Sequence, residues 1–451
     1  MNSSTTPDQA QGQDGPDPAS TIRSKQFVVV LVLAAIVGVI ASIVAWGFLE
    51  LVYYIQVWVY TDVPDALGFD SAPIWWSLPI LAVAGLITAL AIDRLPGEGG
   101  HEPSDGLSPG TIPPIELPGV ILAAFASIGL GMVLGPEAPL MAIGGGIGFM
   151  TIRALRKDAP PQLGQLLASA GVFASLSFLF GSPIIAAVIL IEAAGLNRER
   201  MPLVVIPGLL AAGIGSLVSI GMASWTGLDS SNISLGSLPL TEFGRPEVVD
   251  FLWTVPVAAA VAVGTVLIFT LARRLRVHVA ERRMLLMPLS GLVVGGLAIA
   301  FAEISGKGFE EVLFSGQDSV GSLVANAESW TLSALALLVA FKGVAYAVSL
   351  AGFRGGPVFP ALFLGAAAGL MAGQLPGFEM APAVALCIGA AVVAVLRLPL
   401  SALVLASVLA SAAGPDAMPL VIVGVATSYL VTLYLDGLSW TKATVDKAEA
   451  T

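Results

Sequence analysis

Long apolar runs dominate this chain. Residues 27–60 and 74–92 are about as long as, or longer than, the roughly 20 residues that a helix needs to cross a bilayer. Hydrophobic residues make up 56% of the 451 positions and charged residues only 11%. A soluble globular surface does not tolerate that balance. The chain is therefore predicted to lie mostly in lipid.

The apolar runs also predict the type of secondary structure. They are too long for the roughly ten-residue alternating strands of an outer-membrane barrel, and backbone groups in hydrocarbon must be satisfied within the protein. We therefore predict an all-α polytopic membrane protein. Shorter apolar runs, such as residues 383–396, predict half-helices or broken spans.

The domain organisation follows from where polar segments interrupt the apolar ones. Residues 1–25 are rich in Gln, Asp, Ser, Thr and Pro, which predicts a disordered cytoplasmic tail. No signal peptide is expected before Phe27. We predict a first membrane repeat at 26–224, an extracytoplasmic linker at 225–247, a second, inverted repeat at 248–444 and a short tail at 445–451.

A matched spacing of glycines and prolines indicates a duplication. Pro139 and Pro360 are each followed by glycines five and nine residues later. A general abundance of Gly and Pro in membrane helices, the alternative explanation, predicts no such match. Basic residues precede the helix near Phe27 but follow the helix near Phe251, so the two corresponding helices are predicted to cross in opposite directions. In transporters built from inverted repeats, the substrate lies at the repeat interface near the midplane.

Prolines that open apolar runs predict helix N-termini inside the membrane. Each N-terminus carries unpaired N–H groups and a partial positive charge, so several of them can bind a dehydrated anion without lysine or arginine. Glu137 lies in one such break, in Gly135-Pro-Glu-Ala-Pro139. An ionisable residue at membrane depth indicates function. Its carboxylate is interpreted either as a protonatable plug in the anion's site or as a helix N-cap.

Composition excludes several other functions. A single cysteine, Cys387, forbids an intrachain disulfide, and with two histidines in the chain a metal site is not expected. We predict no cofactor. No basic stripe with aromatics supports nucleic-acid binding, and no nucleophile–base set supports a membrane-embedded enzyme.

Three segments resemble the CLC family of chloride channels and chloride/proton antiporters. The segment 131–148 is similar to the family's gating-glutamate motif, 180–192 to its next signature, and Gly355-Gly-Pro-Val-Phe-Pro360 to its Gly-Gly-Ile-Phe-Ala-Pro segment. Similarity runs from about residue 27 to about residue 444. The resemblance implies an inverted-repeat fold with broken helices meeting at the midplane, a prokaryotic type without C-terminal nucleotide-binding domains, and a homodimer with one pore per subunit.

The resemblance also implies site residues. It assigns the gate to Glu137. The anion-binding set that it implies is Gly135, Pro136, Glu137, Ala138, Gly356, Pro357, Val358, Phe359 and Trp440. Trp440 stands where the family commonly has a pore-lining tyrosine. Its indole N–H is interpreted either as a hydrogen-bond donor to the anion or as part of an interfacial aromatic anchor.

This chain departs from the family pattern at the inner anion site. The family's Gly-Ser-Gly-Ile-Pro motif is replaced by Gly100-His-Glu-Pro103, which lacks the serine. His101, Ser104 and Ser108 are the candidates to replace it. Ala193 stands where some antiporters carry an inner proton-transfer glutamate, which leaves the adjacent Glu192 as a candidate for proton transfer or as a structural carboxylate.

The sequence thus predicts transport of chloride or a similar small anion through a glutamate-gated pore in each subunit, passive or weakly coupled to protons. The alternatives are a fully coupled chloride/proton antiporter and a CLC-shaped protein that has lost transport. Expected partners are the anion, protons, membrane lipid and a second copy of the chain. The expected location is the bacterial inner membrane, with multiple passes.

Overall fold

The computed structural model describes residues 22–107, 112–155, 160–195, 201–226 and 235–438. Nine helices in these ranges are long and apolar enough to cross a membrane. The helices of the first half are α2 (Lys25–Val57), π-helix η1 (Trp58–Asp62), α3 (Val63–Ala66), α4 (Ser77–Arg94), 3-10 helix η2 (Pro103–Asp105), α5 (Leu117–Ala124), π-helix η3 (Phe125–Gly129), α6 (Glu137–Leu155), α7 (Pro161–Phe180), α8 (Pro183–Ala194) and α9 (Met201–Thr226). Those of the second half are α10 (Val248–Glu281), α11 (Arg283–Ser305), 3-10 helix η5 (Phe309–Glu311), α12 (Val320–Ala325), 3-10 helix η6 (Ala327–Ser329), α13 (Leu332–Gly352), α14 (Val358–Ala372), α15 (Met380–Leu396), α16 (Pro399–Leu409), 3-10 helices η7 (Ser411–Ala413) and η8 (Pro415–Ala417), and α17 (Met418–Asp436).

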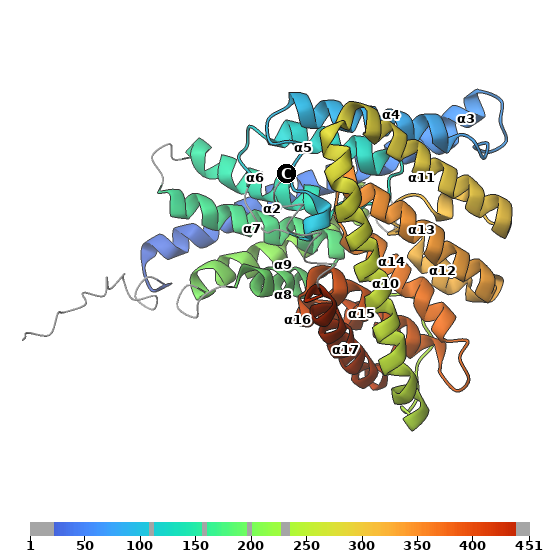
Figure 1. The fold of residues 1–451 in the computed structure, drawn as a ribbon. Helices are drawn as coiled ribbons and strands as arrows, with labels where there is room; N and C mark the ends of the chain where they lie inside the picture. The colour runs from blue at the N-terminus through green and yellow to red at the C-terminus, as the bar shows by residue number, and fades with distance from the viewer. Residues whose placement is uncertain (1–21, 108–111, 156–159, 196–200, 227–234, 439–451) are drawn as a thin grey trace, which may run out of the picture.

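The two halves repeat one pattern of helix contacts. In the first half α6 packs on α7, α7 packs on α9, and α2 packs on both α7 and α9. In the second half α14 packs on α15, α15 on α17, and α10 on both α15 and α17. Figure 1 shows these two groups side by side, with α8 and α16 in contact between them. The predicted all-α fold with two repeats and broken helices is confirmed.

The glycines of the sequence repeat are points of close helix contact. A Cβ atom on Gly148 of α6 would overlap the carbonyl of Leu167 on α7. A Cβ atom on Gly369 of α14 would likewise overlap Val384 of α15. Small residues let membrane helices approach backbone to backbone. The matched spacing therefore reflects the same helix pair built twice.

Local signals in the sequence start several of these helices. Ser24 accepts a hydrogen bond from the amide of Phe27 at the start of α2, and Thr331 accepts one at the start of α13. Glu247 and Asp250 form a reciprocal capping box that starts α10 at Val248. Each of these contacts satisfies amides that a helix leaves unpaired at its N-terminus.

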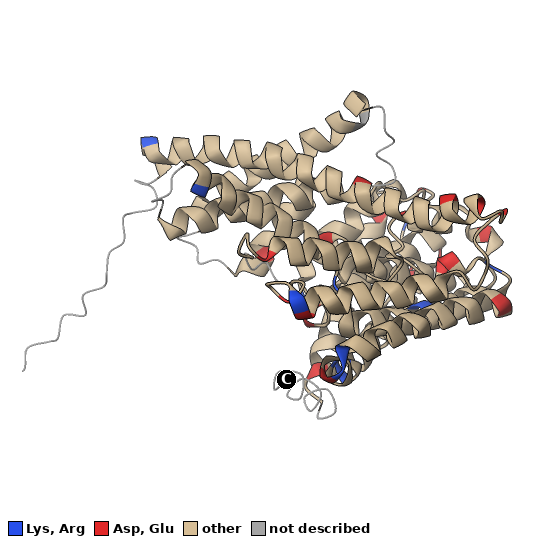
Figure 2. Ribbon diagram, turned by 90° about the horizontal axis from the view of Figure 1, so that it is seen from above, with Lys and Arg blue, Asp and Glu red and all other residues tan. Residues whose placement is uncertain are grey.

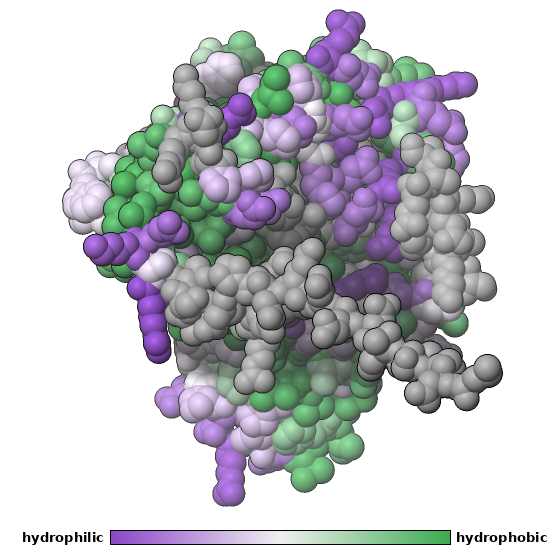
Figure 3. Space-filling model, turned by 90° about the vertical axis from the view of Figure 1, so that its left-hand side faces the viewer, coloured by the Kyte–Doolittle hydropathy of each residue, from purple (hydrophilic) through white to green (hydrophobic). Residues whose placement is uncertain are grey.

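The surface agrees with a membrane environment. Figure 2 shows acidic and basic residues mainly at helix ends and in loops, with long uncharged stretches between them. Figure 3 shows broad apolar areas on one face, separated from groups of hydrophilic residues. On α9 the side chains of Leu217 and Ile220 are 68% and 71% exposed, an arrangement that lipid favours and water does not.

Candidate functional site

The breaks of the two repeats pair with each other at the centre of the molecule. Gly135 and Gly356 form an isolated antiparallel bridge. The amide of Gly135 donates to the carbonyl of Gly356 at 2.7 Å, and the amide of Gly356 donates to the carbonyl of Gly135 at 2.6 Å. Buried backbone that leaves a helix must find such partners inside the protein. The pairing fixes the start of α6 next to the start of α14.

Two serines complete this pairing reciprocally. The amide of Val133 donates to Ser349 Oγ at 3.1 Å, and the amide of Arg354 donates to Ser127 Oγ at 3.1 Å. Each serine thus satisfies a break in the opposite repeat. Neither serine was identified from the sequence, because a serine in an apolar helix carries no signal of its own until the repeat is aligned.

The side chain of Glu137 reaches from the start of α6 to the start of α14. Glu137 is the first residue of α6, it is 0% exposed, and its Oε1 accepts a hydrogen bond from the amide of Val358, the first residue of α14. Its Oε2 is buried and has no hydrogen-bond partner among the described residues. The carboxyl group of Glu137 therefore lies at the N-terminus of α14, and helix N-termini favour negatively charged groups.

The surroundings leave the Glu137 carboxyl little room. A Cβ atom on Gly356 would overlap its Cδ, and one on Gly135 would overlap its Oε2. The ring of Phe359 stacks on that of Phe180, with centroids 5.6 Å apart. A side chain at either break position would therefore displace the Glu137 carboxyl group.

A cavity of about 210 Å³ lies against the first turn of α6 on one side of Glu137. Its lining includes Ala138 and Pro139 of α6, His101 and Glu116 of the α4–α5 connection, and Arg354. We call it the inner cavity, because Arg276 near the basic end of α10 contacts the same connection and basic ends face the cytoplasm.

A smaller crevice of about 30 Å³ lies on the opposite side. It is lined by Pro136, by residues of α2 and by the segment 315–318 that precedes α12. We call it the outer crevice. Asp318 at its margin is exposed, yet partial desolvation raises the pKa of its carboxyl to about 6. The residues on either side of Glu137 in the chain therefore line different spaces, Pro136 the outer crevice and Ala138 the inner cavity.

The structure brings most of the predicted anion-binding residues together. Apart from Glu137, those within the described residues all belong to the two paired breaks and the first turns of α6 and α14: Gly135, Pro136, Ala138, Gly356, Pro357, Val358 and Phe359. Trp440 lies outside the described residues.

Glu192 lies elsewhere, at the junction of α8 and α16. Its carboxylate accepts hydrogen bonds from the amides of Leu400 and Ser401, at 3.0 and 2.8 Å, and from the Ser401 hydroxyl at 2.6 Å. It thus caps the N-terminus of α16. Its proton-transfer role stays a prediction.

The three candidates for the missing serine have different positions. Ser104 is buried, and its hydroxyl accepts a hydrogen bond from Arg276 at 3.1 Å. Ser108 lies outside the described residues. His101 lines the inner cavity; desolvation lowers its pKa below the ordinary value, against the opposing effect of Asp105 and Glu102. Its ring is therefore neutral at neutral pH.

Lys342 is fully buried in α13 and supports the outer crevice. Its Nζ donates to the carbonyls of Glu311 at 2.9 Å and Leu313 at 2.8 Å, and it lies 4.4 Å from the ring centroid of Phe363. It therefore fixes the segment leading to Asp318 and does not contact Glu137.

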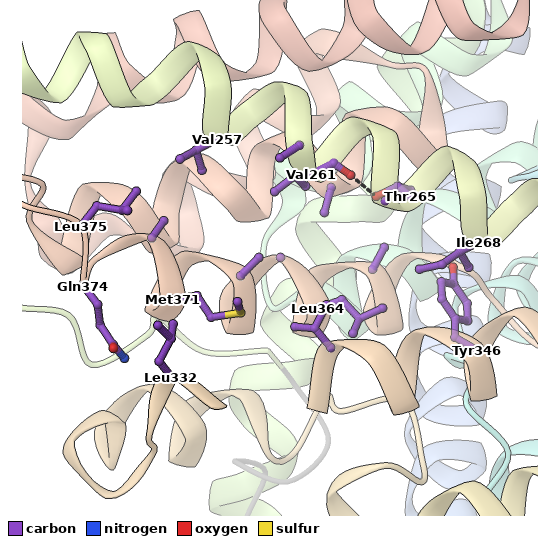
Figure 4. A pocket seen from close by; sticks show the side chains of 18 residues that line it. Val257, Val261, Thr265, Ile268, Leu332, Tyr346, Leu364, Met371, Gln374 and Leu375 are labelled. Carbon is purple, nitrogen blue, oxygen red and sulfur yellow. Dashed lines mark hydrogen bonds between the residues drawn. The ribbon is translucent and has the colours of Figure 1, made fainter. Parts of the chain in front are cut away.

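An apolar groove of about 420 Å³ runs between α10, α13 and α14. Figure 4 shows Gln374, Leu375 and Leu332 towards one end of it and Tyr346 with Ile268 at the other. The Tyr346 hydroxyl donates to the carbonyl of Pro357 at 2.5 Å. The described residues contain no group of three or more metal-ligating side chains.

Fold and site together define a class: a polytopic helical membrane transporter with two repeats, whose broken helices meet around a carboxylate. The family model described as voltage gated chloride channel matches residues 99–433. The chain therefore belongs to the CLC family, and it is an anion-transport protein of the bacterial inner membrane and not an enzyme.

Two relatives described as the ion-transport protein YfeO, from Escherichia fergusonii and Escherichia coli, are each 30% identical over 355 residues, covering 77% of this chain and 80% of theirs. A slow cyanobacterial Cl⁻/H⁺ antiporter aligns with a TM-score of 0.72 at 20% identity, covering 94% of this chain and 98% of its own. A CLC-type fluoride/proton antiporter aligns with a TM-score of 0.66 at 15% identity, covering 90% and 95%. These two structures share the fold.

Proposed function

We propose that this protein moves chloride or a similar small anion through a pathway in each subunit, with Glu137 as its protonatable gate. The ionised carboxylate occupies the anion's place at the start of α14. Protonation, or competition from an anion, releases it. The observation that carries the proposal is the Glu137 Oε1 contact with the Val358 amide, with Oε2 left unbonded.

The carboxylate differs from a cap of its own helix, because Oε1 accepts from the first amide of α14, in the opposite repeat, while Oε2 makes no hydrogen bond of good geometry among the described residues. A structural cap satisfies its carboxylate fully, as Glu192 does with three hydrogen bonds. A buried carboxylate with an unbonded oxygen is costly. Glu137 is therefore poised for displacement by an anion or for protonation.

We propose that coupling to protons is weak or absent. Glu137 supplies an outer proton acceptor, while Ala193 lacks an acid and Glu192 is held by α16. A proton crossing a low-dielectric region needs successive titratable groups or water.

A fully coupled chloride/proton antiporter is the second candidate. The inner cavity favours it, because His101 and Glu116 line the same space as Ala138 next to Glu137. Two of the structural neighbours are described as proton antiporters, of chloride and of fluoride.

Reconstituted liposomes test both candidates. Chloride efflux from liposomes containing the protein is expected, and its absence would favour a CLC-shaped protein without transport. Under an imposed chloride gradient, internal pH is expected to change little. Sustained uphill proton movement at a fixed stoichiometry, abolished by Glu137→Ala, would instead establish the antiporter.

We also propose a homodimer embedded in lipid, with the pathway complete in each subunit. The paired breaks support the second part, because both helix starts around Glu137 come from one chain.

A further inference from the structure

Arg354 is a buried cation with few hydrogen bonds. It lies between α13 and α14 and is 5% exposed. Its Nε donates to the carbonyl of Glu98 at 3.1 Å, and one terminal nitrogen lies 3.6 Å from Glu102 Oε1. Among the described residues, that guanidinium makes one hydrogen bond with its five N–H donors. Burying a charge is costly unless its donors are paired, and the protein itself pairs few of the donors of this guanidinium.

The acid nearest to Arg354 is already bound elsewhere. Glu102 Oε2 lies 2.7 Å from Arg276, which also contacts Asp105 at 2.7 Å. Arg276 and Arg354 therefore share Glu102, and Arg354 is the more distant of the two, at 3.6 Å. Within the described part of the chain, its other donors are free for another group.

The inner cavity is where those donors can be used. Arg354 lines it together with Gly99, Gly100 and the first turn of α6 at Ala138. The α6 start adds amides without helical partners and a partial positive charge. Gly99 and Gly100 have positive φ angles of 73° and 94°, which favour glycine. Neither residue therefore places a side chain in the cavity.

The backbone pairing of the two repeats does not require a cation at this position. The reciprocal hydrogen bonds to Ser127 and Ser349 make Val133 the counterpart of Arg354 in the first repeat. Val133 is apolar and fully buried, and its amide makes the same kind of hydrogen bond. The backbone pairing therefore explains the amide of Arg354 and leaves its guanidinium unexplained.

We propose, resting on the proposed anion transport, that Arg354 is an anion-binding residue of the inner cavity and takes the place of the missing serine hydroxyl. Helix N-termini alone can bind an anion without lysine or arginine, so a cation in this cavity adds to their attraction. Here Glu102 and the cavity-lining Glu116 moderate the charge, so an anion is attracted without being trapped. Arg354 is thus a binding residue for the transported ion.

Chloride transport by the reconstituted full chain tests the proposal. Arg354→Gln and Arg354→Lys are each measured with chloride varied on the inner side and then on the outer side. For Arg354→Gln the half-saturating inner chloride concentration is expected to rise about tenfold, as for loss of a charge-assisted contact. Arg354→Lys is expected to recover most of that loss. The half-saturating chloride concentration on the outer side is expected to stay within about twofold of the wild-type value. A general structural defect would be expected to change both sides.

Glu116→Gln provides an independent arm that does not depend on the Arg354 variants folding. Removing this carboxylate is expected to lower the half-saturating inner concentration about twofold or more. Unchanged inner half-saturation in folded Arg354→Gln, or in Glu116→Gln if the Arg354 variants do not fold, would overturn the proposal.

Calorimetric titration of chloride in detergent separates this proposal from the proposed function. If wild-type protein passes no chloride, the proposed transport fails. The anion-binding role of Arg354 then stands if wild-type protein binds chloride and Arg354→Gln, or Glu116→Gln in its place, changes the affinity in the direction given above. Absence of chloride binding by the wild type would reject that role too.

Discussion

Glu137 keeps its position because the residue facing it has no side chain. Gly356 donates and accepts in the central bridge while the Glu137 carboxyl lies where a Cβ atom would be. The amide of Val358 then holds one carboxyl oxygen. The position of this carboxyl group thus depends on a glycine in the opposite repeat as much as on the glutamate.

Gly356→Ala is expected to destabilise the protein by roughly 1–3 kcal/mol, the usual cost of overpacking. The added methyl group forces the Glu137 side chain away from α14. In the Glu137→Ala background the same substitution is expected to cost much less, because the colliding carboxyl is gone. Thermal unfolding in detergent of the four proteins measures this coupling, and equal costs in both backgrounds would contradict the packing described.

Asp318 is the titratable group at the outer crevice whose charge changes near neutral pH. With a pKa of about 6, it is ionised at pH 7.5 and largely neutral at pH 5. An ionised carboxylate there repels an approaching anion.

Asp318→Asn is therefore expected to raise chloride uptake from the outer side at pH 7.5 by roughly twofold, since a partly screened charge is worth some tenths of a kcal/mol. At pH 5 no difference is expected. Glu310→Gln, an exposed acid on η5 outside the crevice lining, serves as the control. An equal gain at both pH values would rule out the electrostatic explanation.

At the scale of the elements, the helix pairs α6–α7 and α14–α15 hold the two broken helices in place. Their contact points are the glycines whose spacing first indicated the repeat. α6 offers a matched comparison, because a Cβ atom on Gly148 would overlap backbone of α7, while one on Gly145 would meet Val172 at an ordinary 3.4 Å.

Gly148→Ala is accordingly expected to lower the stability by about 1–3 kcal/mol or more, because backbone cannot move aside as a side chain can. Gly145→Ala is expected to be neutral or stabilising by up to about 1 kcal/mol, since alanine favours helix. Melting temperatures in detergent compare the two. A loss of stability in Gly145→Ala as large as that in Gly148→Ala would contradict this explanation, because the two positions would then not differ in the space around them.

Much of this architecture could be predicted from the sequence, and physical reasons separate what could from what could not. Apolar length, helix-opening prolines and matched glycines act locally, so they predicted the helices, the breaks and the position of Glu137 at one of the breaks. Ser127, Ser349 and Arg354 could not be assigned, because their partners are more than 200 residues away in the chain. The role of Glu192 as the cap of α16 depends on the same long-range contacts.

The whole molecule is a lipid-embedded pair of repeats, and its self-association is proposed to depend on the helices alone. Met1 to Ser24 lacks the apolar residues that an interface core requires. Deleting it is expected to leave the dimer intact. Chemical crosslinking in liposomes checks this against the full chain, and a monomeric deletion variant would assign the interface to the tail.

The central claim is that one protonatable carboxylate controls the pathway through the molecule. Chloride efflux from liposomes, recorded across external pH 5 to 8 for wild type and Glu137→Ala, tests it most directly. Wild type is expected to respond steeply to external pH, and Glu137→Ala to conduct with at most the roughly twofold dependence assigned to Asp318. A folded Glu137→Ala protein that keeps the wild-type pH dependence would contradict the account.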